Sequence, residues 1–393
     1  LLTMEEAINN QEVHRIAGLE FENQKVNMLP ISDRFDKGIQ DTLTIKTPHG
    51  SITATPTSRL LVLRKDRPEW IFVQDLKEGD FVATSKLMPK GKEEIPILLN
   101  FLKDNNYLKG DKVREIFNLY SGYRKNRDTA SKLGIKERRY EDLKYGKRSP
   151  AKIIKELIKG KEHLIDGDFK LSGKGKIPFR FNDKLAYLLG LIIGDGHLRH
   201  TDKNDHVTTI HSSNSDRNIV EKYNQYMYDV FGIKDIKYDG KNDYVFSSSV
   251  IGSLLNKLGV PYKDKAHNAI IPNYILNLSN DMIKQFIKGL FDSDGEVHIV
   301  KSGKQINHYT MSEKLNIGLR MVLLRFGIQS TSSRKDDGTY ILTISDASSI
   351  EKFRKEIGLN NTKRNNRLEK EIPVKYNKPV YDRIPISEFL KDL

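Results

Sequence analysis

The chain has 393 residues, with 66 Lys and Arg against 52 Asp and Glu, which gives a net charge of +14. Cysteine is absent, so disulfides, cysteine-based zinc sites and thiol catalysis are excluded. There is no run of 18 apolar residues and no recognisable secretory signal, so we expect a cytoplasmic protein without a membrane span. The positive surplus favours an acidic partner, of which nucleic acid is the commonest.

The positive charge is unevenly distributed along the chain. Residues 1–100 carry a net charge of −2, residues 101–180 carry +11, and residues 181–393 carry +5. The change near residue 100 predicts a domain boundary and, with the patterns below, an α+β fold class. We expect a β-rich domain, a basic helical arm, a duplicated α/β domain and the start of a C-terminal region (1–95, 96–175, 176–375 and 376–393).

The first part reads as strands. Polar and apolar residues alternate in short runs between residues 41 and 84. Pro48-His49-Gly50 and the segment around Pro68 interrupt these runs as turns. The pattern predicts a β-rich domain.

The second part has helical spacing. Val113, Ile116, Phe117 and Tyr120 fall on one face of a helix, and a further helix is predicted around 153–158. Most of the chain's net charge belongs to this part, so the predicted helices form a basic arm.

A helix-turn-helix is predicted inside the arm. Ala130 and Tyr140 lie on either side of a turn at Gly134. The second helix would expose basic side chains that can enter a DNA major groove. These side chains are Lys136, Arg138, Arg139 and Lys144. A solvated helical linker explains the same charges, so both interpretations stay open.

The third part contains one motif twice. LLGLIIGDGHL runs over 188–198 and IKGLFDSDGEV over 287–297. Asp195 and Asp294 occupy the same place in the two copies, 99 residues apart. The repeat predicts a duplicated α/β unit of about 100 residues rather than a solenoid.

Landmarks after each motif keep nearly the same spacing. Lys265 and Lys363, which follow Gly259 and Gly358, are 98 residues apart. The predicted halves are therefore about 180–278 and 279–375.

The two motifs predict a pair of helices that end in carboxylates. Each motif is apolar nearly all round, which is typical of a buried helix, and its glycines allow a second helix to approach closely. Asp195 and Asp294 would then meet at the C-terminal helix ends and repel each other unless a cation lies between them. Mg²⁺ prefers such oxygen ligands, and Lys265 and Lys363 could stabilise charge beside it. A single Asp-Gly at a helix end would be only a stop signal.

Leu188–Gly196 and Ile287–Gly295 resemble the two LAGLIDADG motifs of homing endonucleases, and the resemblance covers roughly 175–375. It implies two pseudo-symmetric halves, each with an antiparallel sheet for the DNA major groove. It also implies cleavage of both DNA strands with Mg²⁺, for which Mn²⁺ can substitute. The implied partner is duplex DNA with a long asymmetric target site, bound by a monomeric pseudo-dimer.

The resemblance also assigns roles to residues. Asp195 and Asp294 would be the catalytic metal ligands, joined by the backbone carbonyls of Gly194 and Ser293. Lys265 and Lys363 resemble the basic residues near the family's active centre, with Lys263 as a rival for the first. Apart from the resemblance, the side chains predicted to face DNA are Arg199, His211, Lys301, His308, Arg334 and Lys335, and surface solubility explains single charges equally well.

The first 90 residues resemble the N-terminal part of an intein splicing domain of the Hint type. LLTMEEAI, GSITATPTSRLLV and DLKEGDFVAT carry this resemblance in order. Thr55 to Ser58 match a splicing block, but Ser58 replaces the usual His. No nucleophilic Cys or Ser precedes Leu1, so we expect an archaeal-type intein endonuclease that does not splice as given.

The sequence thus predicts a Mg²⁺-dependent, site-specific endonuclease for double-stranded DNA. The alternative is a non-cleaving protein of the same fold that binds DNA or RNA as a regulator or maturase. A degenerate splicing protein is a second alternative.

Overall fold

The computed structural model describes residues 4–371 except for short internal segments (21–24, 48–49, 65–66, 92, 122–125, 202–205, 235, 239–242 and 302). The predicted C-terminal region, 376–393, lies outside the described residues. The chain divides into two compact units. One comprises Gly91–Asp294 with Leu359–Lys363, and the other comprises Leu1–Lys90, Gly295–Gly358 and Arg364–Leu393.

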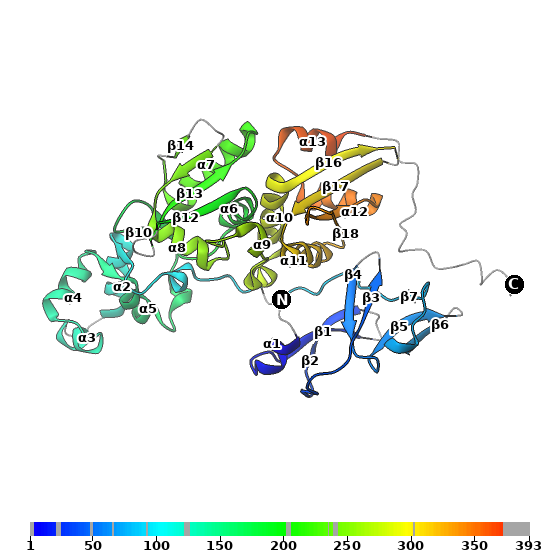
Figure 1. Ribbon diagram of the computed structural model, residues 1–393. Coiled ribbons are helices and arrows are strands. Elements are labelled where there is room, and N and C mark those ends of the chain that lie inside the picture. The colour runs from blue at the N-terminus through cyan, green and yellow to red at the C-terminus, as the bar shows by residue number, and fades with distance from the viewer. Residues whose placement is uncertain are drawn as a thin grey trace. The chain divides into compact units, whose positions relative to one another are not determined.

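The basic arm begins the unit that contains Gly91–Asp294 (Figure 1). Its helices pack on a four-stranded sheet in the order β11-β10-β8-β9. Its core includes Val113, Phe117 and Tyr140, and the last two rings meet edge to face at 5.5 Å. The strands are β8 Tyr107–Lys109, β9 Ser149–Pro150, β10 Asp168–Leu171 and β11 Lys176–Pro178. The helices are α2 Asp111–Ser121, α3 Asn126–Lys132, α4 Glu137–Lys144 and α5 Ala151–Ile158.

The motif helices follow the arm in the same unit. These are α6 Asp183–Gly194 and α10 Asn280–Asp294, which pack side by side along their lengths. An antiparallel sheet in the order β12-β13-β15-β14 follows α6, with α8 packed against β13. The strands are β12 Gly196–Thr201, β13 His206–Ser213, β14 Lys237–Tyr238 and β15 Asp243–Phe246. The helices are α7 Arg217–Phe231, α8 Ser249–Lys257 and α9 Lys265–Asn268.

The second unit repeats this sheet after the second motif. Its strand order is β16-β17-β19-β18, again fully antiparallel, with α11 and α12 on one face. The strands are β16 Gly295–Val300, β17 Gly303–Thr310, β18 Thr331–Arg334 and β19 Tyr340–Ile344. The helices are α11 Glu313–Leu324 and α12 Ala347–Lys352, and α13 Thr362–Glu369 spans the unit boundary. The matching strand orders confirm the predicted mixed architecture of helices and antiparallel sheets.

Short antiparallel strands form the N-terminal part of this second unit, as the alternating sequence indicates. β1 pairs with β2, β3 with β4, and β5 with both β6 and β7. Their bounds are β1 Arg15–Glu20, β2 Lys25–Pro30, β3 Leu43–Thr47, β4 Gly50–Ala54, β5 Arg59–Arg64, β6 Arg67–Phe72 and β7 Phe81–Val82, after helix α1 Met4–Asn9. Among the described residues, no helix is both long and apolar enough to cross a membrane.

Candidate functional site

Glycines let the two motif helices approach within backbone contact. A Cβ atom on Gly190 would lie 2.1 Å from the carbonyl oxygen of Phe286, and one on Gly289 would lie 2.3 Å from that of Tyr187. Both distances are far below van der Waals contact, so only glycine fits at either position. The crossing point is therefore fixed by sequence.

This packing brings the two motif carboxylates to the same place. Asp195 ends α6, and its Oδ2 accepts a hydrogen bond from Asn214 Nδ2 at 2.9 Å. Asp294 ends α10, and its Oδ2 would lie 3.0 Å from a Cβ atom on Gly194. The last turn of α6 therefore lies against the carboxylate of Asp294.

Lys265 supplies a cation at these helix ends. Its Nζ donates a hydrogen bond to the carbonyl oxygen of Gly194. Burial lowers the pKa of Lys265, and the charges of Asp294 and Asp195 act in the opposite direction. The ammonium therefore lies in the electrostatic field of both carboxylates.

The residue before Lys265 has a strained backbone conformation. Asp264 has φ 44° and ψ 50°, the left-handed region that a residue with a Cβ seldom adopts. Such a conformation costs on the order of 1 kcal/mol and persists where surrounding structure enforces it. Lys265 begins the short helix α9 directly after Asp264.

The other predicted lysines lie differently. Lys363 is exposed in the first turn of α13, and no hydrogen bond or ion pair of its side chain occurs within the described part of the chain. Lys263, the rival of Lys265, is also exposed. The equal sequence spacing of Lys265 and Lys363 therefore does not give them equal surroundings.

Ser293 contributes to the close packing here. Its hydroxyl donates to the carbonyl oxygen of Leu290 at 2.8 Å, and its side chain lies where a Cβ on Gly194 would stand. The oxygen donors that the sequence assigned to a metal thus belong to adjoining helix ends. Among the described residues, no group of three or more His, Asp or Glu forms a ready metal cluster.

Asp292 is a site residue that the sequence reasoning missed. It is fully buried on α10, two residues before Asp294, and Tyr187 donates its hydroxyl hydrogen to Asp292 Oδ2 at 2.9 Å. Burial raises the pKa of Asp292, while hydrogen bonds from Asn361 and Asn360 lower it. A buried acid inside the second motif was the available signal.

The first antiparallel sheet presents Arg199 on its open face. Leu198 and Ile210, cross-strand partners, are buried on the other face, while Arg199 is exposed. His211 occupies β13 opposite His197, but its side chain lies outside the described residues.

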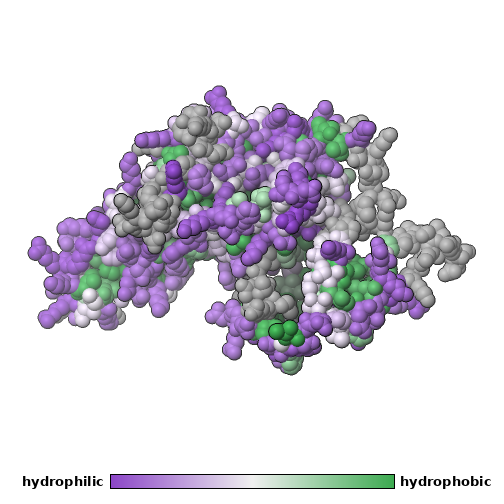
Figure 2. Space-filling model, viewed as in Figure 1, coloured by the Kyte–Doolittle hydropathy of each residue, from purple (hydrophilic) through white to green (hydrophobic). Residues whose placement is uncertain are grey.

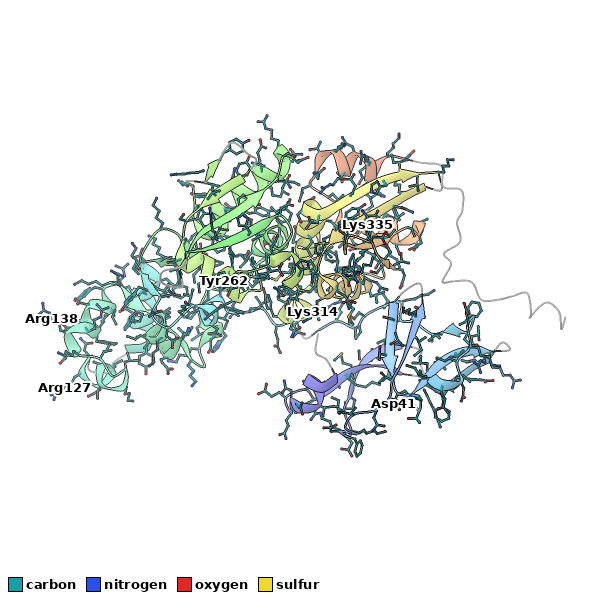
Figure 3. All side chains as sticks on the ribbon, in the orientation of Figure 1. Asp41, Arg127, Arg138, Tyr262, Lys314 and Lys335 are labelled. Atoms are coloured by element: carbon teal, nitrogen blue, oxygen red, sulfur yellow. The ribbon has the colours of Figure 1, made fainter. Side chains whose placement is uncertain are left out.

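The second sheet places its predicted contacts on different faces. Lys335, which is labelled in Figure 3, follows β18. Its Nζ lies 5.4 Å from the centroid of the Tyr309 ring, and Lys301 is exposed in the turn after β16. Arg334 is the cross-strand partner of Tyr340 and lies two residues after Ser332 on β18, so Arg334 and Ser332 share one face of the sheet. The Ser332 hydroxyl donates a hydrogen bond to Asn316 of α11, which packs on that face. Arg334 therefore belongs to the helix-covered side of the sheet.

His308 does not lie on the open face of its sheet, contrary to the sequence expectation. It is fully buried on β17 and shares the core face with Leu342. Burial, with a smaller contribution from the charge of Arg364, lowers its pKa to about 3. Strand alternation places Asn307 and Tyr309 on the face opposite to His308.

The arm has the predicted helix-turn-helix. Gly134 adopts φ +65° between α3 and α4, a conformation that favours glycine. Arg138 is exposed and points away from the arm, whose surface over α3 and α4 is mostly hydrophilic (Figures 2 and 3). Lys136 is exposed at the start of α4 and Lys144 is half-buried in its last turn, whereas Arg139 donates to the carbonyl oxygen of Arg148 at 2.6 Å.

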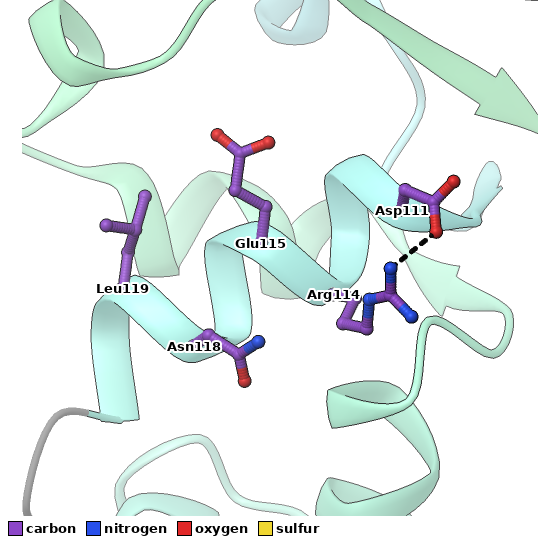
Figure 4. Close-up of a pocket in the computed structure, with 5 residues that line it drawn as sticks. All are labelled: Asp111, Arg114, Glu115, Asn118 and Leu119. Atoms are coloured by element: carbon purple, nitrogen blue, oxygen red, sulfur yellow. Dashed lines mark ion pairs between the residues drawn. The ribbon is translucent and has the colours of Figure 1, made fainter.

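A surface hollow on α2 is unrelated to the carboxylates. It measures about 500 Å³ and is lined by one helix alone, including an ion pair of 2.9 Å between Arg114 and Asp111 (Figure 4). Its lining offers no residue of either motif. We therefore place the candidate site at the motif helix ends.

In the N-terminal part, Thr55 and Ser58 face each other across a turn. Their hydroxyls are 2.9 Å apart, and Ser58 N donates to the carbonyl oxygen of Thr55 at 2.9 Å. The two hydroxyls satisfy each other locally.

The sequence comparisons agree with the duplication. A family model described as LAGLIDADG-like domain matches residues 182–267 and 281–358, one match for each predicted half. The chain therefore contains two LAGLIDADG-like copies.

Curated relatives match most of this chain but only part of themselves. The glutamine–fructose-6-phosphate aminotransferase of Methanocaldococcus jannaschii is 24% identical over 382 residues, covering 89% of this chain and 33% of that protein. The reverse gyrase of the same organism is 26% identical over 380 residues, covering 91% of this chain and 20% of that protein. The chain thus spans a third or less of the length of these relatives.

Solved structures of homing endonucleases cover about half of the chain. Mesophilic variants of I-DmoI share 22% identity with a TM-score of 0.35, covering 44% of this chain and 93% of theirs. I-WcaI, bound to its DNA recognition sequence, shares 14% identity with a TM-score of 0.36, covering 48% and 87%.

Proposed function

We propose that this protein is a site-specific endonuclease that cuts both strands of duplex DNA with a divalent cation, Mg²⁺ or in its place Mn²⁺. The observation that carries the proposal is the meeting of Asp195 and Asp294 at adjoining helix ends beside the Lys265 ammonium. Both carboxylates are half-buried. Converging carboxylates that are partly removed from water are costly unless a cation balances them, so their presence favours a function that uses one.

The residues fit a hard divalent cation. Asp195 and Asp294 would hold it with their carboxylates, next to the carbonyl groups of Gly194 and Ser293, and Lys265 already places a positive charge there. When bound, such a cation polarises a phosphate oxygen and acidifies water. Lys265 would stabilise the negative charge that develops on the phosphate, and Asn214 would hold Asp195 in place.

The open sheet faces and the arm suit duplex DNA. Arg199 lies on the open face of the first sheet and Lys335 on that of the second. Lys301 lies in the turn after β16 of the second sheet. Since the two halves differ in sequence, one chain would read a long asymmetric site as a monomer. The exposed cations of α4 would add phosphate contacts outside that site.

Support for an intein-type origin comes from the relatives. An aminotransferase and a reverse gyrase have unrelated names, yet both match the same kind of segment over a minor part of their length. A segment shared by unrelated proteins is best explained as an insertion that carries its own function. The turn at Thr55 and Ser58 would then belong to a splicing remnant.

Cleavage selection tests the proposal. The full chain is incubated with a plasmid library of random duplex sites in Mg²⁺, and linearised plasmids are recovered. On the selected site, Asp195→Asn and Asp294→Asn should each lower double-strand cleavage at least about 100-fold with binding retained. Asp183→Asn and Asp281→Asn make the same charge change near the opposite ends of the same helices and should cleave normally.

Two results would contradict the proposal. Full cleavage by the double variant would exclude a role for the carboxylates. Specific binding by the wild type without cleavage in Mg²⁺ or Mn²⁺ would instead favour the non-cleaving regulator or maturase.

A further inference from the structure

The carboxylate of Asp292 is the centre of a buried hydrogen-bond network. Its Oδ1 accepts the backbone N–H of Asn360 at 2.8 Å and that of Asn361 at 3.1 Å. Its Oδ2 accepts the hydroxyl of Tyr187 and the side-chain amide of Asn360, each at 2.9 Å. Such charge-assisted bonds hold their donors more firmly than neutral ones do.

These donors come from segments far apart in the sequence. Tyr187 belongs to α6, whereas Asn360 and Asn361 lie just before α13 and its Lys363. The Asn360 side chain also accepts a hydrogen bond from Lys222 of α7 at 2.9 Å. Asp292 therefore ties the end of α10 to α6 and to the chain entering α13.

A second aspartate holds the next residue. Asp216, which caps α7, accepts the backbone N–H of Thr362 at 3.0 Å. The three residues before Lys363 are thus each bonded to an aspartate of the same compact unit.

The first motif has no equivalent of this network. The residue 99 positions before Asp292 is Ile193, whose side chain has no hydrogen-bonding group. At the end of α6, Asn214 donates a hydrogen bond to Asp195. Lys265 donates one to the carbonyl oxygen of Gly194. The two catalytic carboxylates of the proposed nuclease are therefore held by different means.

We propose that Asp292 is a positioning residue that fixes the Asp294 end of the motif helices and the start of α13. Asp292 would therefore contribute more to the cleavage of one DNA strand than to the cleavage of the other. The inference rests on the proposed nuclease function. Asp292 would not touch DNA or metal, because it is fully buried and its oxygens face Tyr187 and the Asn360–Asn361 turn.

Strand-resolved cleavage tests this role. The selected target is labelled separately on each strand, and both cleavage rates are measured for the full chain in Mg²⁺. Asp292→Asn should slow one strand about ten-fold more than the other, so that nicked plasmid accumulates with its break always in the same strand. Tyr187→Phe removes one bond without changing charge and should bias the same strand about three-fold.

A matched control separates positioning from lost stability. Asp229→Asn breaks a surface ion pair of 2.7 Å with Lys184 in the same unit, and it should leave the strand ratio unchanged. Thermal unfolding shows whether each variant is folded. If Asp292→Asn does not fold, the strand ratio of Tyr187→Phe tests the inference. Equal slowing of both strands by Asp292→Asn and Tyr187→Phe would overturn the inference while the nuclease stands. A wild type that cuts neither strand would overturn both.

Discussion

Lys265 donates a hydrogen bond from its ammonium to the carbonyl oxygen of Gly194, the residue before Asp195. The cation thereby stands at the end of α6, in the field of Asp195 and Asp294. Lys363, its counterpart by spacing, is exposed. The two lysines should therefore contribute unequally to any chemistry at the carboxylates.

Replacing Lys265 by Met should lower cleavage about 100-fold, because a positive charge that acts on both carboxylates is lost. Thermal unfolding should also become more sensitive to Mg²⁺, which can take over the neutralisation of Asp195 and Asp294. Lys363→Met is the control and should leave the Mg²⁺ dependence of Tm as it is in the wild type. The same Mg²⁺ response in both variants would contradict the assigned position of Lys265.

The helix crossing makes a prediction about stability. Gly190→Ala and Gly289→Ala should each destabilise the protein by about 3 kcal/mol or more, because backbone carbonyls stand 2.1 and 2.3 Å from the added Cβ. Gly173→Ala is the control, since nothing lies within 4 Å of its Cβ position. Urea unfolding measures all three. Equal urea midpoints for the two motif variants and for Gly173→Ala would show that α6 and α10 can move apart without a loss of stability.

The fold was largely predictable because the duplication repeats each sequence pattern, so that each copy supports the interpretation of the other. Gly190 and Gly289 recur 99 residues apart, and close packing of the motif helices follows from them. The buried helix predicted for the first motif appears as α6 Asp183–Gly194. The turn at Gly134 was also readable, since glycine suits its positive φ.

The site was less predictable where a side chain's surroundings depend on distant segments. Asp292 stands out in the sequence only as an acid within the second motif, and its role depends on a turn 68 residues later in the chain. Lys265 directly follows the left-handed Asp264, a backbone conformation that sequence spacing does not indicate. His308 was assigned to the wrong face because its strand register was unknown.

The arm makes a prediction about salt. If Lys136, Arg138 and Lys144 contact phosphates, changing all three to Ala should reduce the slope of log K against log salt concentration by up to about 0.9 for each contact. Lys155→Ala is the control, because Lys155 is paired with Asp104 at 2.9 Å and with the carbonyl of Leu102. Fluorescence anisotropy at several salt concentrations measures the slope. An unchanged slope in the triple variant would leave the arm as a solvated linker.

Burial of His308 makes a prediction about acid stability. Its folded-state pKa is about 3 against an ordinary value of 6.5, because burial disfavours the imidazolium and Arg364 adds repulsion. Below pH 6.5 the unfolded chain therefore binds a proton that the folded chain does not, and protonation favours unfolding. The free energy of unfolding should fall by about 1.4 kcal/mol for each pH unit between 6.5 and 3 from this residue alone.

The variant His308→Met has a similar volume and cannot titrate, so its unfolding free energy should lose that part of the slope. Leu342, the buried cross-strand partner of His308, provides the packing control, and Leu342→Met should keep the slope of the wild type. Urea unfolding at pH 7, 6 and 5 gives the comparison. Parallel slopes for wild type and His308→Met would mean that water reaches this imidazole and that the second sheet is packed less tightly than its buried strands indicate.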